Sequence, residues 1–553
     1  MAGQTEQGKN SGENPKTNSR LASQALWQRY CKYLIADRDL GFSLDVSRVQ
    51  FDEEYLQQMS AAMNEAITAI ERIEQGAIAN QDEQRMVGHY WLRAPSLAPT
   101  PEITSAIHQS IEQIEQFATD VHMGNLSGQN GAFTDLLHIG IGGSALGPQF
   151  VSQAIGSTED KLRLHFVDNT DPDGIDLILN RLHDKLGQTL VTVVSKSGTT
   201  PEPNNGMLEV QTTYKRMGID FAPHAVAVTV AGSRLDGIAK DQGWIGRFPM
   251  WDWVGGRTSV MAAAGLLPLA LQGIDIRSLL DGAAAIDRLT RMKDLRANPA
   301  AMFALMWHKL GGGRGDKDMI VLPYKDRLLL LGRYLQQLVM ESLGKQFDRS
   351  GNVVYQGISV YGNKGSTDQH AYVQQLREGL ANFFAVFIQV LHDRDGRSIE
   401  VEPGVTTGDY LLGFLHGTRC ALYENQRESI TITLDRVSAA SVGALIGLFD
   451  RTVGLYAELI NINAYHQPGV EAGKKAAAAV IELQTRVLSH LAHIDGERTA
   501  DQIAAAIGHT GESEAVYKIL QHLAANPERG ITMKDAKSPQ DVTFRGQSLC
   551  PQP

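Results

Sequence analysis

Two series of short apolar segments constrain the fold of this 553-residue chain more than any other feature. The first begins at about residue 134 and contains DLLHIGIGGS, LRLHFVDNTDPD, TLVTVVSKSGTT and HAVAVTVAGS. The second begins at about residue 319 and contains MIVLPYKD, GISVYGNKGS, FFAVFIQV and SITITLD. Helical patterns separate these segments, and strands that alternate with helices predict parallel, doubly wound sheets. We therefore expect an α/β protein with two such subdomains, at residues 128–290 and 291–475.

The remaining segments predict extensions at both ends. Residues 1–20 lack an apolar segment and predict a disordered leader. Over residues 21–127, apolar residues recur three and four positions apart, which predicts an all-helical lead-in. Residues 476–553 predict a helical extension with a loose tail from residue 533. Two short helices around a glycine turn there resemble a helix-turn-helix, but few basic residues accompany them, which favours a packing appendage over DNA binding.

Composition narrows the possible partners. There are 62 acidic and 51 basic residues, a formal net charge of −11, and no basic run long enough to follow a nucleic acid. No apolar stretch reaches the ~20 residues that a membrane-spanning helix needs. Three widely spaced cysteines favour neither disulfides nor a zinc site: Cys31, Cys420 and Cys550. We expect a cytoplasmic protein without nucleic-acid or membrane partners.

A glycine cluster follows the first strand of the first series. The cluster and the residue after it are Gly140, Gly142, Gly143 and Ser144. Backbone N–H groups of glycines before a helix form an anion site. The pattern Gly140-x-Gly142-x-x-Ala145 also approximates a dinucleotide fingerprint, with Asp168 as a candidate ribose ligand, although its spacing is loose. A tight turn without any ligand is the third alternative.

The loop SKSGTTPE is the strongest candidate for binding phosphate. Hydroxyl groups come from Ser195, Ser197, Thr199 and Thr200. Gly198 lets the backbone curl and Lys196 adds a cation before the expected helix. The GxxxxGK[ST] form of a nucleotide loop is missing, which favours a sugar phosphate over ATP. A Ser/Thr-rich helix cap is the structural alternative.

Candidates for proton transfer and charge stabilisation follow. In WDWVGGR a glycine turn delivers Arg257, which is suited to stabilise an oxyanion, although a surface arginine after a turn is common. In RYLQQLVMESLGKQFD, Gln337 and Glu341 share one face of a helix. A carboxylate among apolar neighbours is a candidate base, and a solvated helix charge is the alternative.

Two further segments carry candidate residues. His370 ends the loop GNKGSTDQH and can exchange a proton near neutral pH, or it is structural. The segment INAYHQPGVEAGKKAA carries Gln467, Glu471 and Lys474 across a Pro-Gly turn. Lys474 either points inward or caps and solvates the helix.

Taken together, these segments resemble the phosphoglucose isomerase family. The resemblance runs from NQDEQRMVGHYWLR through GIGGSALGP, SKSGTTPE, WDWVGGR, QQLVMESLGK and DQH to HQPGVEAGK, and so covers residues 80–474. It implies two sugar-isomerase subdomains, each a five-stranded, mostly parallel sheet between helices (an αβα sandwich). It also implies a homodimer with the active site near the interface.

By motif position, the resemblance implies a role for each candidate residue. Ser195, Lys196, Ser197 and Thr200 would hold the phosphate, Gly143 and Ser144 would line the sugar, and Gln337 and Gln467 would contact its hydroxyls. Glu341 would be the base, Arg257 would stabilise the enediolate, and Lys474 and His370, the latter from the neighbouring subunit, would assist ring opening. We expect no metal or other cofactor, since no cluster has ligand spacing.

The expected activity is reversible aldose–ketose isomerisation of glucose 6-phosphate and fructose 6-phosphate through a cis-enediol, in glycolysis and gluconeogenesis. Thr258 stands where the family usually has Phe or Tyr, Pro468 where an aromatic residue is frequent, and GNKGSTDQH replaces the commoner GEPGTNGQH. These departures leave open a dual-specificity phosphoglucose/phosphomannose isomerase. A non-catalytic sugar-phosphate-binding protein and a nicotinamide-dependent dehydrogenase are alternatives from other classes.

Overall fold

The computed structural model describes residues 15–546, and the side chains of residues 23–470 and 472–546. The chain divides into two compact units, Met1–His466 and Gln467–Pro553, which are described separately as the first and second units.

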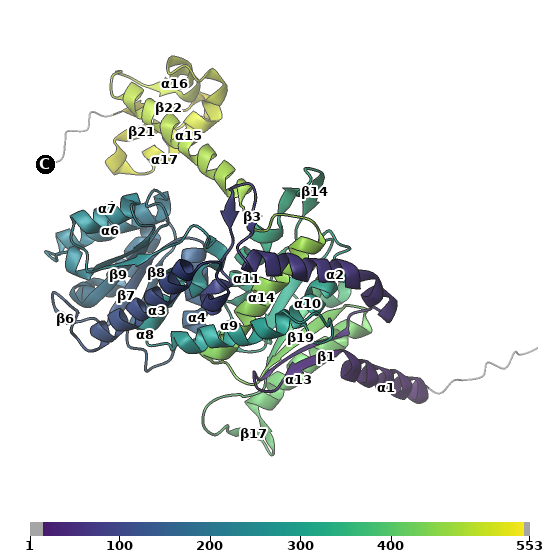
Figure 1. Ribbon diagram of the computed structural model, residues 1–553. Helices are drawn as coiled ribbons and strands as arrows, with labels where there is room; N and C mark the ends of the chain where they lie inside the picture. Colours follow the sequence, from purple (N-terminus) through teal and green to yellow (C-terminus); the bar gives the residue numbers. More distant parts are fainter. Residues whose placement is uncertain (1–14, 547–553) are drawn as a thin grey trace, which may run out of the picture. The chain divides into compact units, whose positions relative to one another are not determined.

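The first unit contains a sheet of five parallel strands in the order β11-β10-β9-β7-β8. The strands are β7 (Asp135–Ile139), β8 (Arg163–Val167), β9 (Thr189–Val194), β10 (Ala225–Thr229) and β11 (Gly246–Pro249). Helices cover both faces (Figure 1): α3 (Pro101–His122) and α8 (Ala263–Gln272) on one, α5 (Pro172–Leu182), α6 (Pro201–Arg216) and α7 (Arg234–Asp241) on the other. Successive side chains alternate between these layers, because Leu136 packs in one core cluster and Leu137 in the other.

The second sheet has six strands, in the order β1-β2-β19-β16-β12-β15. The strands are β1 (Leu34–Asp37), β2 (Phe42–Arg48), β12 (Asp318–Pro323), β15 (Val360–Tyr361), β16 (Phe383–Val390) and β19 (Ser429–Leu434). Helices α10 (Pro299–Leu310) and α14 (Ala439–Leu459) pack with Met319 on one face, and α12 (Val373–Glu378) and α13 (Thr407–Glu424) pack with Ile320 on the other. The prediction of two doubly wound, mostly parallel sheets is confirmed. The prediction of five strands in each sheet was wrong for the second sheet, which has six.

Two of these six strands, β1 and β2, come from the expected all-helical lead-in, so that prediction was wrong. Helices α1 (Pro15–Tyr33), α2 (Glu53–Glu74) and α3 are present, but residues 34–48 form an antiparallel hairpin that pairs with β19. Phe42, Leu44 and Val46 are buried at every second position, which is a strand period that the flanking helical patterns concealed. Helix α1 begins at Pro15, inside the segment expected to be a disordered leader, and residues 1–14 lie outside the described part.

Closely packed helices join the two sheets into one core. Helix α9 (Ile276–Thr290) approaches α14 so closely that a Cβ atom on Gly443 would lie 1.9 Å from the Leu279 carbonyl oxygen. The buried Arg93 donates to Asp287 of α9 at 2.8 Å and to Asp450 of α14 at 2.9 Å. Apolar contacts and a buried arginine that is paired with two carboxylates therefore hold α9 and α14 together.

The second unit has a hydrophobic core of its own. Helix α15 (Pro468–Leu491) is followed by β20 (Arg498–Thr499), α16 (Ala500–Ala506), α17 (Ser513–Ala524), β21 (Ile531–Lys534) and β22 (Thr543–Gly546). The predicted helix pair is confirmed. The loose tail expected from residue 533 was wrong for residues 533–546, because β22 pairs with both β20 and β21 and fully buries Phe544. Residues 547–553, with Cys550, lie outside the described part.

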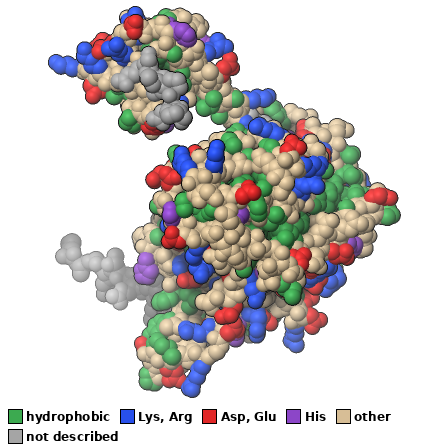
Figure 2. Space-filling view, turned by 90° about the vertical axis from the view of Figure 1, so that its left-hand side faces the viewer, with side chains coloured by type: hydrophobic (Ala, Val, Ile, Leu, Met, Phe, Trp, Pro, Cys, Tyr) green, Lys and Arg blue, Asp and Glu red, His purple; other side chains and the backbone are tan. Residues whose placement is uncertain are grey.

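Acidic and basic side chains are interspersed over the face drawn in Figure 2. Among residues 15–546, no helix combines the length and the apolar character required to cross a bilayer.

Candidate active site

The glycine loop between β7 and α4 (Gly143–Ile155) forms one wall of the site. Gly142 has φ +57°, a conformation that side chains disfavour. A Cβ atom on Gly143 would lie 1.8 Å from the carbonyl oxygen of Gly256, so glycine is required there. The loop therefore packs directly against the turn that carries Arg257, and the predicted strand–glycine–helix order is confirmed.

A buried histidine, His138, is hydrogen-bonded to this loop. The His138 Nε2 group donates to the Ser144 carbonyl oxygen at 2.7 Å, and its Nδ1 atom accepts from the Thr192 hydroxyl at 2.8 Å. Burial lowers the pKa of His138 to about 4, so the imidazole is neutral near pH 7. His138 was not a candidate from sequence, since one histidine within an apolar strand gives no functional signal.

The hydroxyl-rich loop, residues 195–200, lies between β9 and α6 as predicted. Ser195 is buried, and its Oγ atom accepts from the Gly198 backbone N–H at 3.0 Å. Gly198 has φ +73°, and a Cβ atom there would lie 2.3 Å from the Leu235 nitrogen. Ser197 and Thr199 are exposed, and within the described residues the Thr200 side chain makes no capping hydrogen bond with α6. The hydroxyls are therefore presented at a helix N-terminus, which suits an anion better than the helix-cap alternative.

Lys196 connects this loop to the next one. Its ammonium group donates to the Asp252 carbonyl oxygen at 3.1 Å and lies 3.4 Å from the Asp252 carboxylate. Burial lowers the pKa of Lys196, and the Asp252 charge opposes that shift. The contact fixes the cation beside the hydroxyls and joins residues 195–200 to the turn that leads into Arg257.

Arg257 is buried at the start of η5 (Gly256–Met261). Its guanidinium donates to the Ser342 hydroxyl at 3.3 Å and to the Ala464 carbonyl oxygen at 3.2 Å, and it lies 3.3 Å from the Glu341 carboxylate. Burial lowers the pKa of Arg257, and the Glu341 charge raises it. Because an arginine keeps its proton even when buried, the site holds a permanent positive charge beside Glu341.

Glu341 lies on a π-helical turn, η7 (Gln336–Glu341), which follows α11 (Leu331–Leu335). The Gln337 amide donates to the second Glu341 carboxylate oxygen at 2.9 Å, which confirms the predicted shared face. A Cβ atom on Gly142 would lie 3.0 Å from the same amide nitrogen, so the glycine loop touches this turn. Gln337 and Arg257 each engage one carboxylate oxygen, and single π-helical turns are frequent at functional sites.

One residue at this site was missed. Lys345 is 5% exposed, and its ammonium donates to the backbone carbonyl oxygens of Glu341 and Ser342. Its position four residues after Glu341 in the same helical pattern was the only available signal.

Contacts connect the segments that carry the predicted residues of the first unit, with one exception. His370 is exposed at the end of η8 (Thr367–His370), away from the contacts described above. Gln467 and Lys474 belong to the second unit, where Gln467 immediately precedes α15 and Lys474 lies within it.

Two other kinds of ligand, a dinucleotide at the glycine loop and a metal ion, require side chains that are available to bind them. Asp168, the residue that a dinucleotide site would use for ribose, accepts from Gln149 at 2.8 Å and lies 3.4 Å from Arg333. Its carboxylate is therefore engaged within the protein. In the described part of the chain, no three His, Cys, Asp or Glu side chains gather as a metal site.

Comparisons with known proteins agree with this geometry. The family model described as phosphoglucose isomerase matches residues 45–403 and 380–496. A glucose-6-phosphate isomerase of Nostoc punctiforme is 57% identical over 525 residues, covering 95% of this chain and 99% of the relative. One of Geobacter sulfurreducens is 58% identical, covering 93% and 98%. A crystal structure of a glucose-6-phosphate isomerase from Chlamydia trachomatis matches with a TM-score of 0.77 at 28% identity, covering 84% of this chain and 92% of that one.

Proposed function

Because this chain belongs to the phosphoglucose isomerase family, we propose that it interconverts glucose 6-phosphate and fructose 6-phosphate. The enzyme is an aldose–ketose isomerase of glycolysis and gluconeogenesis. The observation that carries the proposed mechanism is the Glu341 carboxylate, held by Gln337 at 2.9 Å and by Arg257 at 3.3 Å. A carboxylate positioned in this way can move a proton between two neighbouring carbons.

The substrate phosphate is held by residues 195–200. The residues assigned to it are Ser195, Lys196, Ser197 and Thr200. The N-terminus of α6 and the Lys196 ammonium match a dianionic phosphomonoester. Gly143 and Ser144 line the sugar, since Gly143 packs directly against the Gly256–Arg257 turn. Phosphate binding then orients the reacting carbons, so this loop contributes to turnover as well as to affinity.

Glu341 transfers the proton. From the open-chain aldose, its carboxylate removes the proton on carbon 2. The freed electron pair forms the carbon 1–carbon 2 double bond, and the carbonyl π pair moves to oxygen 1, which gives a cis-enediolate. A proton then passes from the oxygen 2 hydroxyl to oxygen 1. The protonated Glu341 returns its proton to carbon 1 while oxygen 2 becomes the carbonyl of the ketose. Negative charge that develops on the substrate oxygens lies beside the Arg257 guanidinium, whose charge does not titrate.

The remaining roles follow from motif position. His370 and Lys474 assist ring opening, which requires a proton to move from the carbon 1 hydroxyl to the ring oxygen. Gln337 and Gln467 contact sugar hydroxyls. An imidazole can both donate and accept a proton, and an ammonium group can stabilise developing negative charge, which supports the first assignment.

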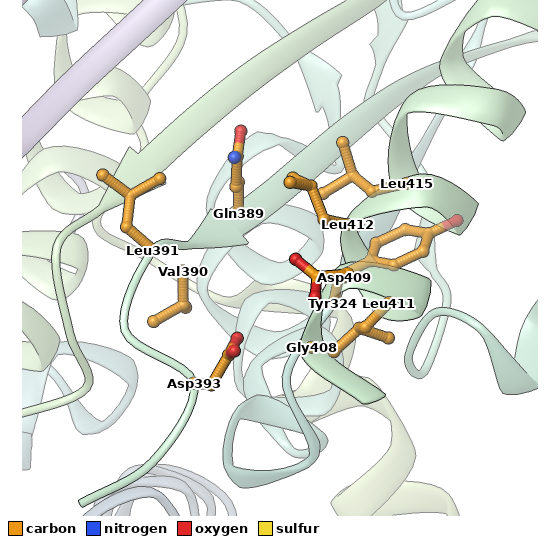
Figure 3. A pocket seen from close by; sticks show the side chains of 10 residues that line it. All are labelled: Tyr324, Gln389, Val390, Leu391, Asp393, Gly408, Asp409, Leu411, Leu412 and Leu415. Carbon is orange, nitrogen blue, oxygen red and sulfur yellow. The ribbon is translucent and has the colours of Figure 1, made fainter. Parts of the chain in front are cut away.

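We infer that the enzyme is a homodimer and that His370 serves the partner's site. Helix α13 exposes three apolar side chains, Tyr410, Leu412 and Phe414. Beside it, a pocket of about 130 Å³ lies between α13 and the end of β16, and Leu391 and Leu412 both line it (Figure 3). Apolar surface of this kind is typical of subunit interfaces. The residue before His370, Gln369, donates to Thr418 of α13, so His370 stands next to this surface.

The enzyme acts in the cytoplasm, where thiols remain reduced. The two cysteines in the described part of the chain, Cys31 and Cys420, are free and exposed, which supports this compartment.

A coupled assay with fructose 6-phosphate, run with and without a chelator, tests the proposed function. We expect turnover that the chelator leaves unchanged. Absence of turnover overturns the function, and loss of turnover with the chelator overturns the metal-free mechanism. The same assay with mannose 6-phosphate determines whether the enzyme has dual specificity, since the two aldoses differ only at carbon 2.

A further inference from the structure

The turn that carries Glu341 is capped by a buried cation. Lys345 opens β13 (Lys345–Phe347), and its Nζ atom lies 2.7 Å from the Glu341 carbonyl oxygen and 2.8 Å from that of Ser342. Only 5% of Lys345 is exposed. Carbonyl groups at the end of a helical segment carry partial negative charge, so an ammonium group is well placed to satisfy them.

The same turn is held from its other side by Arg257. The Arg257 guanidinium donates to the Ser342 hydroxyl at 3.3 Å and pairs with the Glu341 carboxylate at 3.3 Å. Two cations therefore restrain residues 341–342, one through the backbone and the other through the side chains. Burial and the Arg257 charge lower the pKa of Lys345 to about 7. An apolar side chain of similar length would avoid that electrostatic cost, so packing alone does not account for a lysine here.

We propose that Lys345 is a positioning residue for the isomerisation: its ammonium fixes the backbone of residues 341–342 and thereby aims the Glu341 carboxylate at the substrate carbons. This inference rests on the proposed function. Proton transfer requires the base within hydrogen-bond reach, and a misplacement of ~1 Å can cost ~10²-fold in rate. Lys345 touches neither the phosphate loop nor the glycine loop through the contacts above, so it affects turnover rather than affinity.

The test compares K345M with K317M. Lys317 is also a partly buried, paired lysine, 3.1 Å from Glu428, but it precedes the amino end of β12, whereas the site is built on segments that follow the carboxyl ends of the strands. With fructose 6-phosphate, we expect K345M to lower kcat ~10- to 100-fold and to leave KM within about twofold. K317M should leave both unchanged. K345R should restore part of kcat, because a guanidinium can also donate to two carbonyl oxygens.

Combining K345M with E341Q separates positioning from a general loss of folded protein. If Lys345 acts through Glu341, K345M should cost nothing further in the E341Q background. An equal loss in both backgrounds, or wild-type kcat in K345M, overturns the proposal. If K345M does not fold, K345Q takes its place, because the amide still donates one hydrogen bond, and the same outcomes apply. An inactive wild-type enzyme would instead overturn the proposed function.

Discussion

The carboxyl ends of the two sheets supply different chemistry to the same site. The segments that follow the first sheet are rich in glycine and hydroxyl groups, and Ser197 and Thr199 are exposed to solvent. The segment that follows β12 of the second sheet carries Glu341 and Lys345 beside the buried Leu338 and Val339. Binding an anion that is always charged requires many donors, whereas proton transfer requires one titratable group in a dry and rigid setting.

This contrast predicts how variants divide between affinity and turnover. Changes in the hydroxyl-rich loop, residues 195–200, should act mainly on KM, and changes on η7 and its partner Arg257 mainly on kcat. The predictions below test that division, beginning with the largest expected effect.

E341Q should lower kcat by ~10³-fold, because the amide cannot accept the proton, while fructose 6-phosphate still binds. Steady-state kinetics give kcat, and calorimetric titration gives binding. E378Q, at an exposed glutamate of helix α12, is the matched control and should leave kcat unchanged. Unchanged turnover in E341Q would exclude Glu341 as the base.

R257K should lower kcat by ~10²-fold with a smaller change in KM. A lysine keeps the charge but cannot bridge the Glu341 carboxylate, Ser342 and the substrate oxygens with one planar group. Initial rates in both reaction directions measure this effect. A larger effect on KM than on kcat would place Arg257 in ground-state binding instead.

K196A should raise KM by ~10-fold and weaken inhibition by inorganic phosphate similarly, while kcat falls less. The charge-assisted contact with phosphate is lost, but Glu341 and Arg257 remain in place. K215A removes an exposed lysine from the last turn of the same helix, α6, and should change neither constant. Equal losses from K196A and K215A would show only a long-range charge effect.

The smallest effect on turnover near neutral pH is expected at His138. Its folded-state pKa, about 4, lies below the ordinary value of 6.5, so the unfolded state binds more protons between these values. Stability from this group is complete above about pH 6.5, and ~3 kcal/mol is lost as the pH falls toward about 4. Urea midpoints at pH 7.5 and pH 5 should differ less in H138Q than in the wild type. H183Q, at an exposed histidine, should retain the wild-type pH dependence.

Local patterns explain which parts of the site were predictable. The glycine and hydroxyl loops follow apolar strands directly, and the Gln337–Glu341 pair depends only on helical spacing. Lys345 was missed as a site residue because the sequence pattern does not show that its ammonium group donates to the carbonyl oxygens of the preceding turn. The β1–β2 hairpin was missed because its partner, β19, lies about 390 residues later in the chain.

Periodicity and loop composition were therefore enough to predict two doubly wound sheets, a hydroxyl-rich loop before a helix, and the shared face of Gln337 and Glu341, because each of these is encoded by neighbouring residues. Tertiary packing decided the places of β1 and β2 in the second sheet, the ion pair between Arg257 and Glu341, and the burial of Lys345. These features join segments that are distant in sequence, or depend on which side chains lose water. Such contacts form only when the whole chain has packed.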